Sequence, residues 1–162
     1  MRLGIIGAGR VGASFVLAFP SAVEGILCST AEHTQEQAAR LHATAYTDGA
    51  DLIRHCDVLL LTVRDDVLAP VSRELAASLK GERQLSDRCV FHCSGAMDLS
   101  PLEALASLGI HTGSIHPLQS FAEPSAERLK GIYMAVDGDE QARGVAESIV
   151  RTLGSTPFFV PP

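Results

Sequence analysis

Residues 113–121, GSIHPLQSF, place a histidine directly before a proline, at the end of a short run of apolar and small residues. An imidazole changes charge near neutral pH, so it can donate a proton to an oxygen or nitrogen atom that becomes basic during a reaction. His116 is therefore a candidate catalytic residue, and Gln119 and Ser120 are candidate substrate contacts. The alternative for all three is a polar turn that closes a strand.

The strongest motif lies near the N-terminus, where residues 2–19 read RLGIIGAGRVGASFVLAF. Its glycines fit Gly-x-Gly-x-x-Gly between a predicted strand and a predicted helix. In this pattern Gly7 permits a tight turn, Gly9 lets a pyrophosphate approach the backbone, and Gly12 lets helix and strand pack closely. The positive end of the helix attracts phosphate groups, so we expect a dinucleotide here rather than a turn alone. The predicted contacts are Gly7, Ala8, Gly9, Arg10, Val11 and Gly12.

The end of the second predicted strand bears on which dinucleotide binds. NAD-binding chains usually carry Asp or Glu there to hold the ribose 2′-hydroxyl, whereas this segment, VEGILCST, ends in Ser29 and Thr30. Hydroxyls remove a repulsion against a 2′-phosphate, and Arg10 can supply a positive charge. This favours NADP. Glu32, expected in the loop past the strand, lies about 20 residues after Gly12 and keeps NAD as the alternative.

Two further strand ends are predicted to reach the same edge, because ligands bind outside the carboxyl ends of parallel strands. Val63 and Arg64 end the run at 58–63 and are expected beside the ribose or nicotinamide. Ser94 and Gly95 follow the run at 89–93. The Ser94 hydroxyl suits a hydrogen bond to a substrate carbonyl or to the nicotinamide carboxamide, although Ser-Gly is also ordinary turn chemistry.

The elements that must position these residues alternate between short apolar runs and segments with helical period. This alternation predicts an α/β fold with a doubly wound, mostly parallel Rossmann sheet and helices on both faces. Residues 115–132 lack a helix of full length, which leaves room for antiparallel pairing of the last strands. The runs are 3–6, 25–28, 58–63, 89–93, 110–115, 132–136 and 157–160, with a weak candidate at 43–46.

Helix starts are predicted from capping residues. Ser100, followed by a proline, and Thr34 each begin a possible capping box, and Asp139 is expected to cap the last helix. Pro70 places the start of another helix near itself, with residues 65–68 as a preceding turn.

Composition excludes several classes of protein. Hydrophobic residues make up 46% and charged residues 20% of the chain, so a folded domain is expected rather than disorder. The net charge of −6 argues against nucleic acid or an anionic membrane as partner, and no apolar run reaches the roughly 20 residues that span a bilayer. Cys28, Cys56, Cys89 and Cys93 form no Cys-x-x-Cys pair, which favours a reducing cytoplasm. No metal site is expected.

Four segments together resemble a known family: GIIGAGRVG, TVRDDVLAPV, FHCSGAMDLSPLEAL and GSIHPLQSFAEP. The chain is similar over essentially its whole length to the N-terminal Rossmann-like domain of a family of largely uncharacterised oxidoreductases. These carry a helical C-terminal domain of unknown function and share their plan with pyrroline-5-carboxylate reductase, ketopantoate reductase, prephenate dehydrogenase and 6-phosphogluconate dehydrogenase. The resemblance implies a nicotinamide near Val63, Ser94 and Gly95, with the His-Pro segment facing the substrate. Arg64 departs from the family, whose loops often have proline there.

The expected function is an NADP(H)-dependent oxidoreductase acting on a small carbonyl, imine or 2-hydroxy acid. The alternative is a non-catalytic dinucleotide-binding sensor or the cofactor half of a larger assembly. Residues 1–160 are expected to form the dinucleotide-binding domain, and Pro161 and Pro162 to begin a linker. The helical domain that would complete the substrate pocket, and through which a homodimer would form, is expected to be absent from this sequence, so turnover by these residues alone should be negligible.

Overall fold

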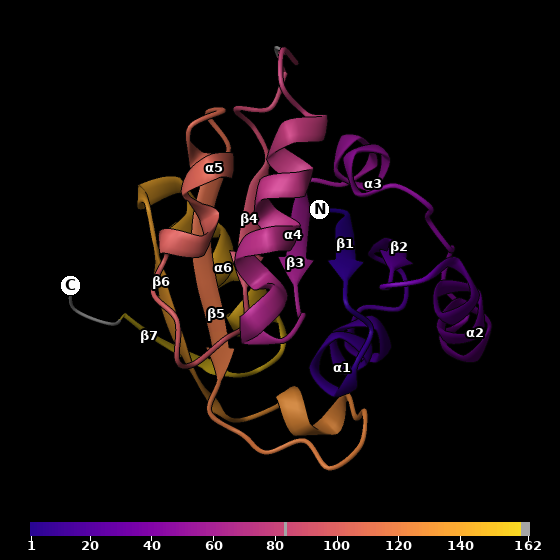
Figure 1. Cartoon of the computed structure of the whole chain (residues 1–162). Coiled ribbons are helices and arrows are strands. Elements are labelled where there is room, and N and C mark those ends of the chain that lie inside the picture. Colours follow the sequence, from indigo (N-terminus) through magenta and orange to yellow (C-terminus); the bar gives the residue numbers. More distant parts are fainter. Residues whose placement is uncertain (83, 160–162) are drawn as a thin grey trace.

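A single sheet of seven strands forms the centre of the computed structural model, which describes residues 1–82 and 84–159. The strand order is β2-β1-β3-β4-β5-β6-β7 (Figure 1). Strands β1 to β5 pair in parallel, β6 runs antiparallel to β5, and β7 runs parallel to β6. The predicted Rossmann-like sheet with an antiparallel pair near its end is confirmed. The strands are β1 (Leu3–Ile6), β2 (Val23–Leu27), β3 (Val58–Leu61), β4 (Cys89–His92), β5 (His111–Pro117), β6 (Tyr133–Gly138) and β7 (Thr156–Phe159).

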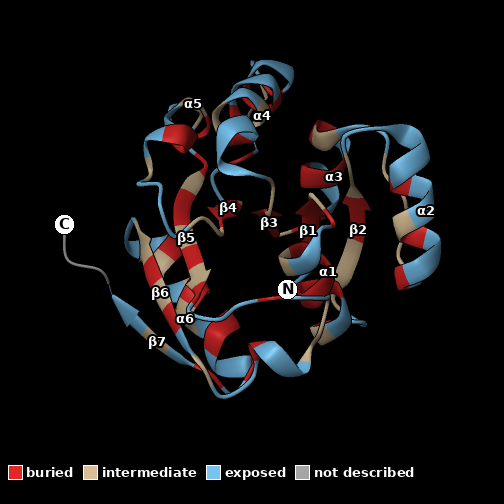
Figure 2. Cartoon of the chain, turned by 60° about the horizontal axis from the view of Figure 1, so that its bottom comes forward, coloured by how far each residue is buried: buried red, intermediate tan, exposed pale blue. Residues whose placement is uncertain are grey.

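Helices cover both faces of the sheet and create two separate apolar cores. One core contains buried residues of α1, α2 and α6, and the other contains buried residues of α3, α4 and α5. Alternate residues of the central strands enter opposite cores, as Ile5 and Ile6 of β1 do. Figure 2 shows the central strands buried and the outer faces of the helices exposed. The helices are α1 (Arg10–Ala18), α2 (Ala31–Leu41), α3 (Gly49–His55), α4 (Asp65–Ser78), α5 (Glu103–Ala106) and α6 (Glu140–Thr152), with 3₁₀ turns η1 (Ser100–Leu102) and η2 (Glu127–Leu129).

Burial on both faces explains why the strands are short and apolar throughout. Every residue of β1, β3 and β4 is buried. A strand in this position cannot alternate polar and apolar residues, because neither face meets water. The weak candidate at 43–46 is reduced to one isolated bridge between Ile26 and Ala45, held by Ile26 N donating to Thr44 O and Tyr46 N donating to Ile26 O. This bridge adds one residue pair to the sheet beyond β2.

The start of α2 differs from the prediction. Thr30, rather than Thr34, is the N-cap, and its hydroxyl oxygen accepts a hydrogen bond from His33 N at 3.1 Å. Thr34 lies buried inside the helix, where its hydroxyl donates to Thr30 O and accepts from Cys28 N. Because β2 already ends at Leu27, the chain has room to begin the helix one turn earlier than the capping pattern indicated.

Two other predicted helix starts are also wrong, and one is right. Ser100 does not cap α5 but opens η1, where Asp98 Oδ1 accepts from Ser100 N at 3.0 Å and from Ser100 Oγ at 2.6 Å. Helix α4 begins at Asp65 and contains Pro70, because acidic residues in its first turn suit the helix dipole and the proline removes only one hydrogen bond. Asp139 caps α6 as predicted, accepting from Ala142 N at 2.9 Å.

Ser72 is a weak point in the face of α4 that meets the sheet. Its side chain is fully buried, and its Oγ has no hydrogen-bond partner among the described residues. Replacing Ser72 by Ala removes an unpaired hydroxyl and improves helix propensity, so we expect the free energy of unfolding to rise by about 1 kcal/mol. Urea denaturation measures this. Ser78→Ala, at an exposed site in the same helix, improves propensity but removes a hydroxyl that is already bonded to Glu74 O, and should gain about half as much or less. Equal gains would contradict a cost from burying the hydroxyl.

Candidate functional site

The glycine loop is built by close backbone packing between β1, α1 and the residue after β3. Gly7 adopts φ +96°, a conformation that side chains rarely allow. A Cβ on Gly12 would lie 2.2 Å from Gly7 O and 2.4 Å from Thr62 Oγ1, so no other residue fits there. A Cβ on Gly9, by contrast, would meet no atom within 4 Å, which leaves its outer side open to a ligand.

Thr62 fixes this loop and is a residue that the sequence interpretation missed. Its hydroxyl donates to Gly7 O at 2.6 Å, just below the first turn of α1. The hydrogen bond ties the end of β3 to the end of β1, the two neighbouring strands between which the chain changes direction across the sheet. A hydroxyl within the otherwise apolar run at 58–63 was the sequence signal for it.

The first turn of α1 carries no group that would neutralise its positive end. Its N-cap is Gly9, which has no side chain to accept a hydrogen bond, and the first turn contains no acidic residue. The N–H groups of Arg10, Val11 and Gly12 have no intrahelical acceptor, because the first N–H groups of any α-helix lack one. Gly9 and Arg10 are exposed, so these donors face the outside of the loop, where an anion can reach them.

A pocket of about 470 Å³ opens beside the glycine loop at the carboxyl ends of β1 and β2. Its volume is within the range of small-molecule sites. It is mainly apolar, with Ile6 and Leu27 from the strands and Val67 and Val71 from α4. Two carboxylates, Asp48 and Glu74, also line it. The other lining residues are Gly7, Cys28, Ser29, Thr47, Gly49, Ala50, Val63, Leu75 and Ser78.

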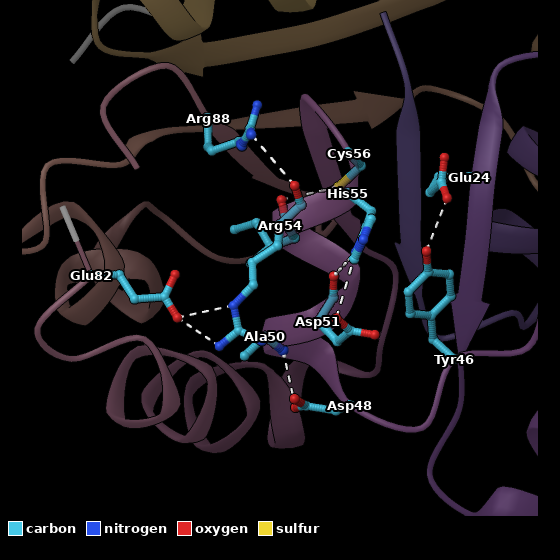
Figure 3. A network of polar contacts seen from close by, with 11 residues as sticks. Glu24, Tyr46, Asp48, Ala50, Asp51, Arg54, His55, Cys56, Glu82 and Arg88 are labelled. Carbon is cyan, nitrogen blue, oxygen red and sulfur yellow. Dashed lines mark hydrogen bonds and ion pairs between the residues drawn. The ribbon is translucent and has the colours of Figure 1, made fainter. Parts of the chain in front are cut away.

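The helices around this pocket are tied together by polar contacts. Asp48 Oδ1 accepts from Ala50 N at 3.1 Å and caps α3 (Figure 3). Arg54 of the same helix donates from Nε and Nη2 to Glu82, which follows α4, at 3.0 and 2.6 Å. The contact with Glu82 raises the pKa of Arg54. The ion pair links α3 to the segment that follows α4.

Of the residues predicted to select the dinucleotide, Ser29 belongs to the lining of this pocket, whereas Thr30, Glu32 and Arg10 do not. Ser29 lines it, and Ser29 and Thr30 are both exposed after β2. Glu32 lies in the first turn of α2 rather than in a loop. Arg64 is paired with Asp66 through two hydrogen bonds, of 3.0 and 2.5 Å, so much of its charge is already matched. Arg10 has no ion-pair partner within the described part of the chain.

A tight turn after β4 holds Ser94. His92, which is fully buried at the end of β4, accepts a hydrogen bond from Ser94 N at Nδ1 (3.2 Å) and bonds Asp98 O through Nε2 (2.9 Å). Ser94 Oγ accepts from Ala96 N and Met97 N, both at 3.2 Å. The turn chemistry expected as an alternative is thus present, and the Ser94 hydroxyl hydrogen is still free to donate outward.

His116 lies beside this turn in a defined tautomer. Its Nδ1 is 3.2 Å from Cys93 O, and because a carbonyl only accepts, Nδ1 carries the proton. The neutral ring therefore has an unprotonated Nε2. A Cβ on Gly95 would lie 2.3 Å from this Nε2, so Gly95 makes room for the imidazole. Burial raises the pKa of the Cys93 thiol to about 12, so this side chain stays neutral.

Gln119 and Ser120 follow at the start of the long connection to β6. Both are exposed, Gln119 Oε1 accepts from Ser120 N at 3.0 Å, and Arg128 donates to Ser120 O at 3.2 Å. The connection packs against α1, where Ser125 N donates to the buried Ser14 Oγ at 2.9 Å. In Figure 1 this segment crosses the edge of the sheet at which α1 begins. The structure thus brings the glycine loop, Ser94 and His116 to one edge, with Gln119 and Ser120 at its outside.

Three findings concern absences in residues 1–82 and 84–159. No group of three His, Cys, Asp or Glu side chains gathers there as metal ligands would. No helix in those ranges is long and apolar enough to cross a membrane. The four cysteines there form no disulfide.

The contact between Gly95 and His116 generates a prediction. Gly95→Ala should force the imidazole aside and lower the free energy of unfolding by about 1–2 kcal/mol, the usual cost of overpacking. Gly144→Ala is the matched control, because a Cβ at this exposed site within α6 meets no atom within 4 Å and should stabilise the helix by about 0.5–1 kcal/mol. Urea denaturation gives both values, and the ring signals of His116 report its displacement. Unchanged ring signals in Gly95→Ala would show that the contact is not made.

Solved structures share this architecture at low sequence identity. Prephenate dehydrogenase from Aquifex aeolicus, in complex with hydroxyphenyl propionate and NAD⁺, superposes with a TM-score of 0.78 and 14% identity over 100% of this chain and 60% of its own. Synechocystis arogenate dehydrogenase gives 0.78 and 15% over 100% and 60%. Plasmodium falciparum pyrroline carboxylate reductase with NADP bound gives 0.69 and 13% over 99% and 58%. At this identity the likeness shows the fold, and the chain spans about 60% of the length of these proteins.

No curated protein matches the chain. A family model, described as a Rossmann-like domain, matches residues 1–117, which include the glycine loop, the Ser94 turn and His116. The chain therefore belongs to the Rossmann-like domain family.

Proposed function

We propose that this chain is the dinucleotide-binding part of an NADP(H)-dependent oxidoreductase that acts on a small carbonyl, imine or 2-hydroxy acid. The observation that carries the proposal is the placement of His116, with an unprotonated Nε2, at the same sheet edge as an unobstructed glycine loop. A dinucleotide module without chemistry would not need a second polar group held in one tautomer at the sheet edge that carries that loop. The structural relatives supply the analogy of fold, and the site supplies the argument for function.

The residues present fit a nicotinamide dinucleotide. The open side of Gly9 and the N–H groups of the first turn of α1 suit a pyrophosphate. The pocket between α3 and α4 suits an adenosine, with apolar surface for the base and two carboxylates to accept hydrogen bonds from its amino group. When bound, the nicotinamide ring supplies hydride transfer at its C4 atom. Val63, which lines the pocket, and Ser94 and Gly95 then mark the course of the dinucleotide toward the nicotinamide end.

His116 supplies the proton chemistry in this proposal. In the oxidation direction its Nε2 accepts the proton of a substrate hydroxyl as the hydride leaves the adjacent carbon. In the reverse direction the imidazolium returns that proton to the oxygen or nitrogen. Cys93 O holds the ring through Nδ1 in both directions, and the Ser94 hydroxyl can donate to the substrate or to the carboxamide. Gln119 and Ser120 are proposed as outer substrate contacts.

NADP is the proposed cofactor because the end of β2 offers hydroxyls in place of the carboxylate that holds the ribose of NAD. No carboxylate belongs to the end of β2, Ser29 and Thr30 offer hydroxyls there, and Arg10 is exposed at the start of α1. Three carboxylates oppose this choice: Glu32 in the first turn of α2, and Asp48 and Glu74 in the pocket lining. One of the structural relatives holds NADP and another NAD⁺. The assignment therefore depends on Ser29, Thr30 and Arg10 of this chain.

The cofactor assignment predicts tighter binding of NADPH than of NADH. A tenfold preference corresponds to about 1.4 kcal/mol, which one charge-assisted hydrogen bond can supply. Calorimetry with both dinucleotides measures the ratio. Arg10→Ala should reduce the ratio several-fold, and Arg64→Ala, which removes an arginine already paired with Asp66, should leave it nearly unchanged. Tighter binding of NADH would overturn the assignment.

The glycine loop predicts a separation of binding from stability. Gly9→Ala should weaken NADPH about tenfold or more, because the methyl group occupies the approach of the pyrophosphate, with the midpoint of thermal unfolding nearly unchanged. Gly12→Ala should lower that midpoint, since its methyl group would collide with Gly7 O. Undiminished NADPH binding by Gly9→Ala would show that the loop is only a turn.

The proton role predicts a loss of turnover in His116→Asn. The asparagine amide can still donate to Cys93 O but has no equivalent of Nε2, so turnover by the protein that includes the expected helical domain should fall about 10²–10⁴-fold. NADPH affinity should change little. The assay follows NADPH oxidation with a panel of small ketones, imines and keto acids. His111→Asn, which removes the histidine paired with Asp139 at the opposite edge of the sheet, is the control. Turnover at the wild-type rate in His116→Asn would overturn the proton role.

A further inference from the structure

We propose that His92 is a positioning residue that sets the tautomer of His116 through the peptide group between Cys93 and Ser94. His92 is buried at the end of β4 and has no part in the chemistry above, yet both of its ring nitrogens are hydrogen-bonded. The inference rests on the proposed function only for its catalytic consequence. The effect on the ring of His116 is a property of the protein without cofactor or substrate.

The four hydrogen-bonding groups form one chain. His116 Nδ1 donates to Cys93 O at 3.2 Å, and Ser94 N, which belongs to the same peptide group, donates to His92 Nδ1 at 3.2 Å. His92 Nε2 then donates to Asp98 O at 2.9 Å. In each of these three hydrogen bonds the donor lies on the side of His116 and the acceptor on the side of Asp98.

The direction of the chain is fixed at its far end. Asp98 O is a carbonyl and can only accept, so the proton of neutral His92 lies on Nε2. Nδ1 of His92 then carries a lone pair and can accept from Ser94 N. If His92 held its proton on Nδ1, or carried two protons, two N–H groups would face each other at Nδ1 and Ser94 N. The turn would then have to open.

The peptide group transmits this arrangement to His116. Amide resonance couples the N–H and C=O of one peptide, so a hydrogen bond at Ser94 N increases the negative charge on Cys93 O. A stronger acceptor at Cys93 O favours the tautomer of His116 that has its proton on Nδ1. That tautomer leaves Nε2 free to accept the proton of the substrate.

The surroundings of His92 keep it neutral. Burial lowers its pKa, and the effect of burial exceeds that of the charged groups around it. Those groups are Asp98 in the turn, Asp65 at the start of α4 and His116 on β5. Asp98 is held by Ser100 rather than by the ring, since its side chain accepts from Ser100 N and Oγ.

The test reads the ring of His116 directly. Long-range ¹H–¹⁵N spectra of the labelled chain at about pH 8, without ligand, give the proton position on each imidazole, and His116→Asn assigns the signals. We expect the wild-type ring to carry its proton on Nδ1. In His92→Phe the ratio of the two tautomers should move toward Nε2–H by up to about twofold, because the bond from Ser94 N strengthens the acceptor at Cys93 O by roughly 10–30% of one hydrogen bond.

Two conservative variants distinguish an effect of the hydrogen bonds of His92 from an effect of its packing. His92→Asn places an oxygen near the position of Nδ1 and should keep the wild-type tautomer of His116. His92→Gln places its amide near Nε2, keeps the bond to Asp98 O and should shift the ratio as Phe does. Val90→Ala creates a cavity on the same face of β4 and should leave the ratio of the His116 tautomers unchanged. If His92→Phe fails to fold, the Asn and Gln variants decide.

The proposal is overturned if His116 keeps its tautomer in His92→Phe, if the Asn and Gln variants behave alike, or if Val90→Ala shifts the ratio as much. None of these outcomes depends on NADPH binding or turnover. A failed search for a substrate would therefore leave this test intact, and a failed tautomer test would leave the dinucleotide site intact.

Discussion

The contact of Gly12 with the carbonyl of Gly7 is the constraint on which the rest of the site depends. It brings the axis of α1 so close to the end of β1 that only a hydrogen atom fits between them, and Thr62 closes the remaining side with its hydroxyl. The first N–H groups of α1 therefore lie at the point where the chain leaves β1 toward β2 and later returns as β3. A side chain larger than hydrogen would tilt the helix and move those donors away from the edge that Ser94 and His116 share.

The connection between β5 and β6 is the second constraint, and it follows from strand direction. A crossover between parallel strands carries the chain back to the opposite edge of the sheet, as α4 does between β3 and β4. Because β6 runs antiparallel to β5, Pro117 pairs with Met134 and the intervening residues stay at the carboxyl edge. The loop then fastens to α1 through Ser14 and buries Phe121. The antiparallel pair thus provides the wall of the site beside His116.

Much of this fold could be predicted, because strands buried on both faces leave a simple pattern of short apolar runs. β1 was placed to the residue, and the missing helix at 115–132 correctly indicated an antiparallel pair. Helix starts were less predictable, because Thr30 and Thr34 are equally good caps in sequence, and Ser100, also a good cap in sequence, is instead the first residue of η1. Only the length of the preceding strand or turn decides between them.

The candidate site shows the same division between local and long-range information. Glycine spacing is local, so the roles of Gly7 and Gly12 could be stated before the structure was known. The contact of Gly95 with the ring of His116, the bond of Thr62 to Gly7 and the bridge from His92 to His116 each join different strands. A histidine in the last position of a buried strand looks in sequence like any core residue. Its importance arises because β4 and β5 are neighbours in register, with His92 paired opposite Ser114, two residues before His116. That register sets both imidazoles against the two sides of a single peptide group.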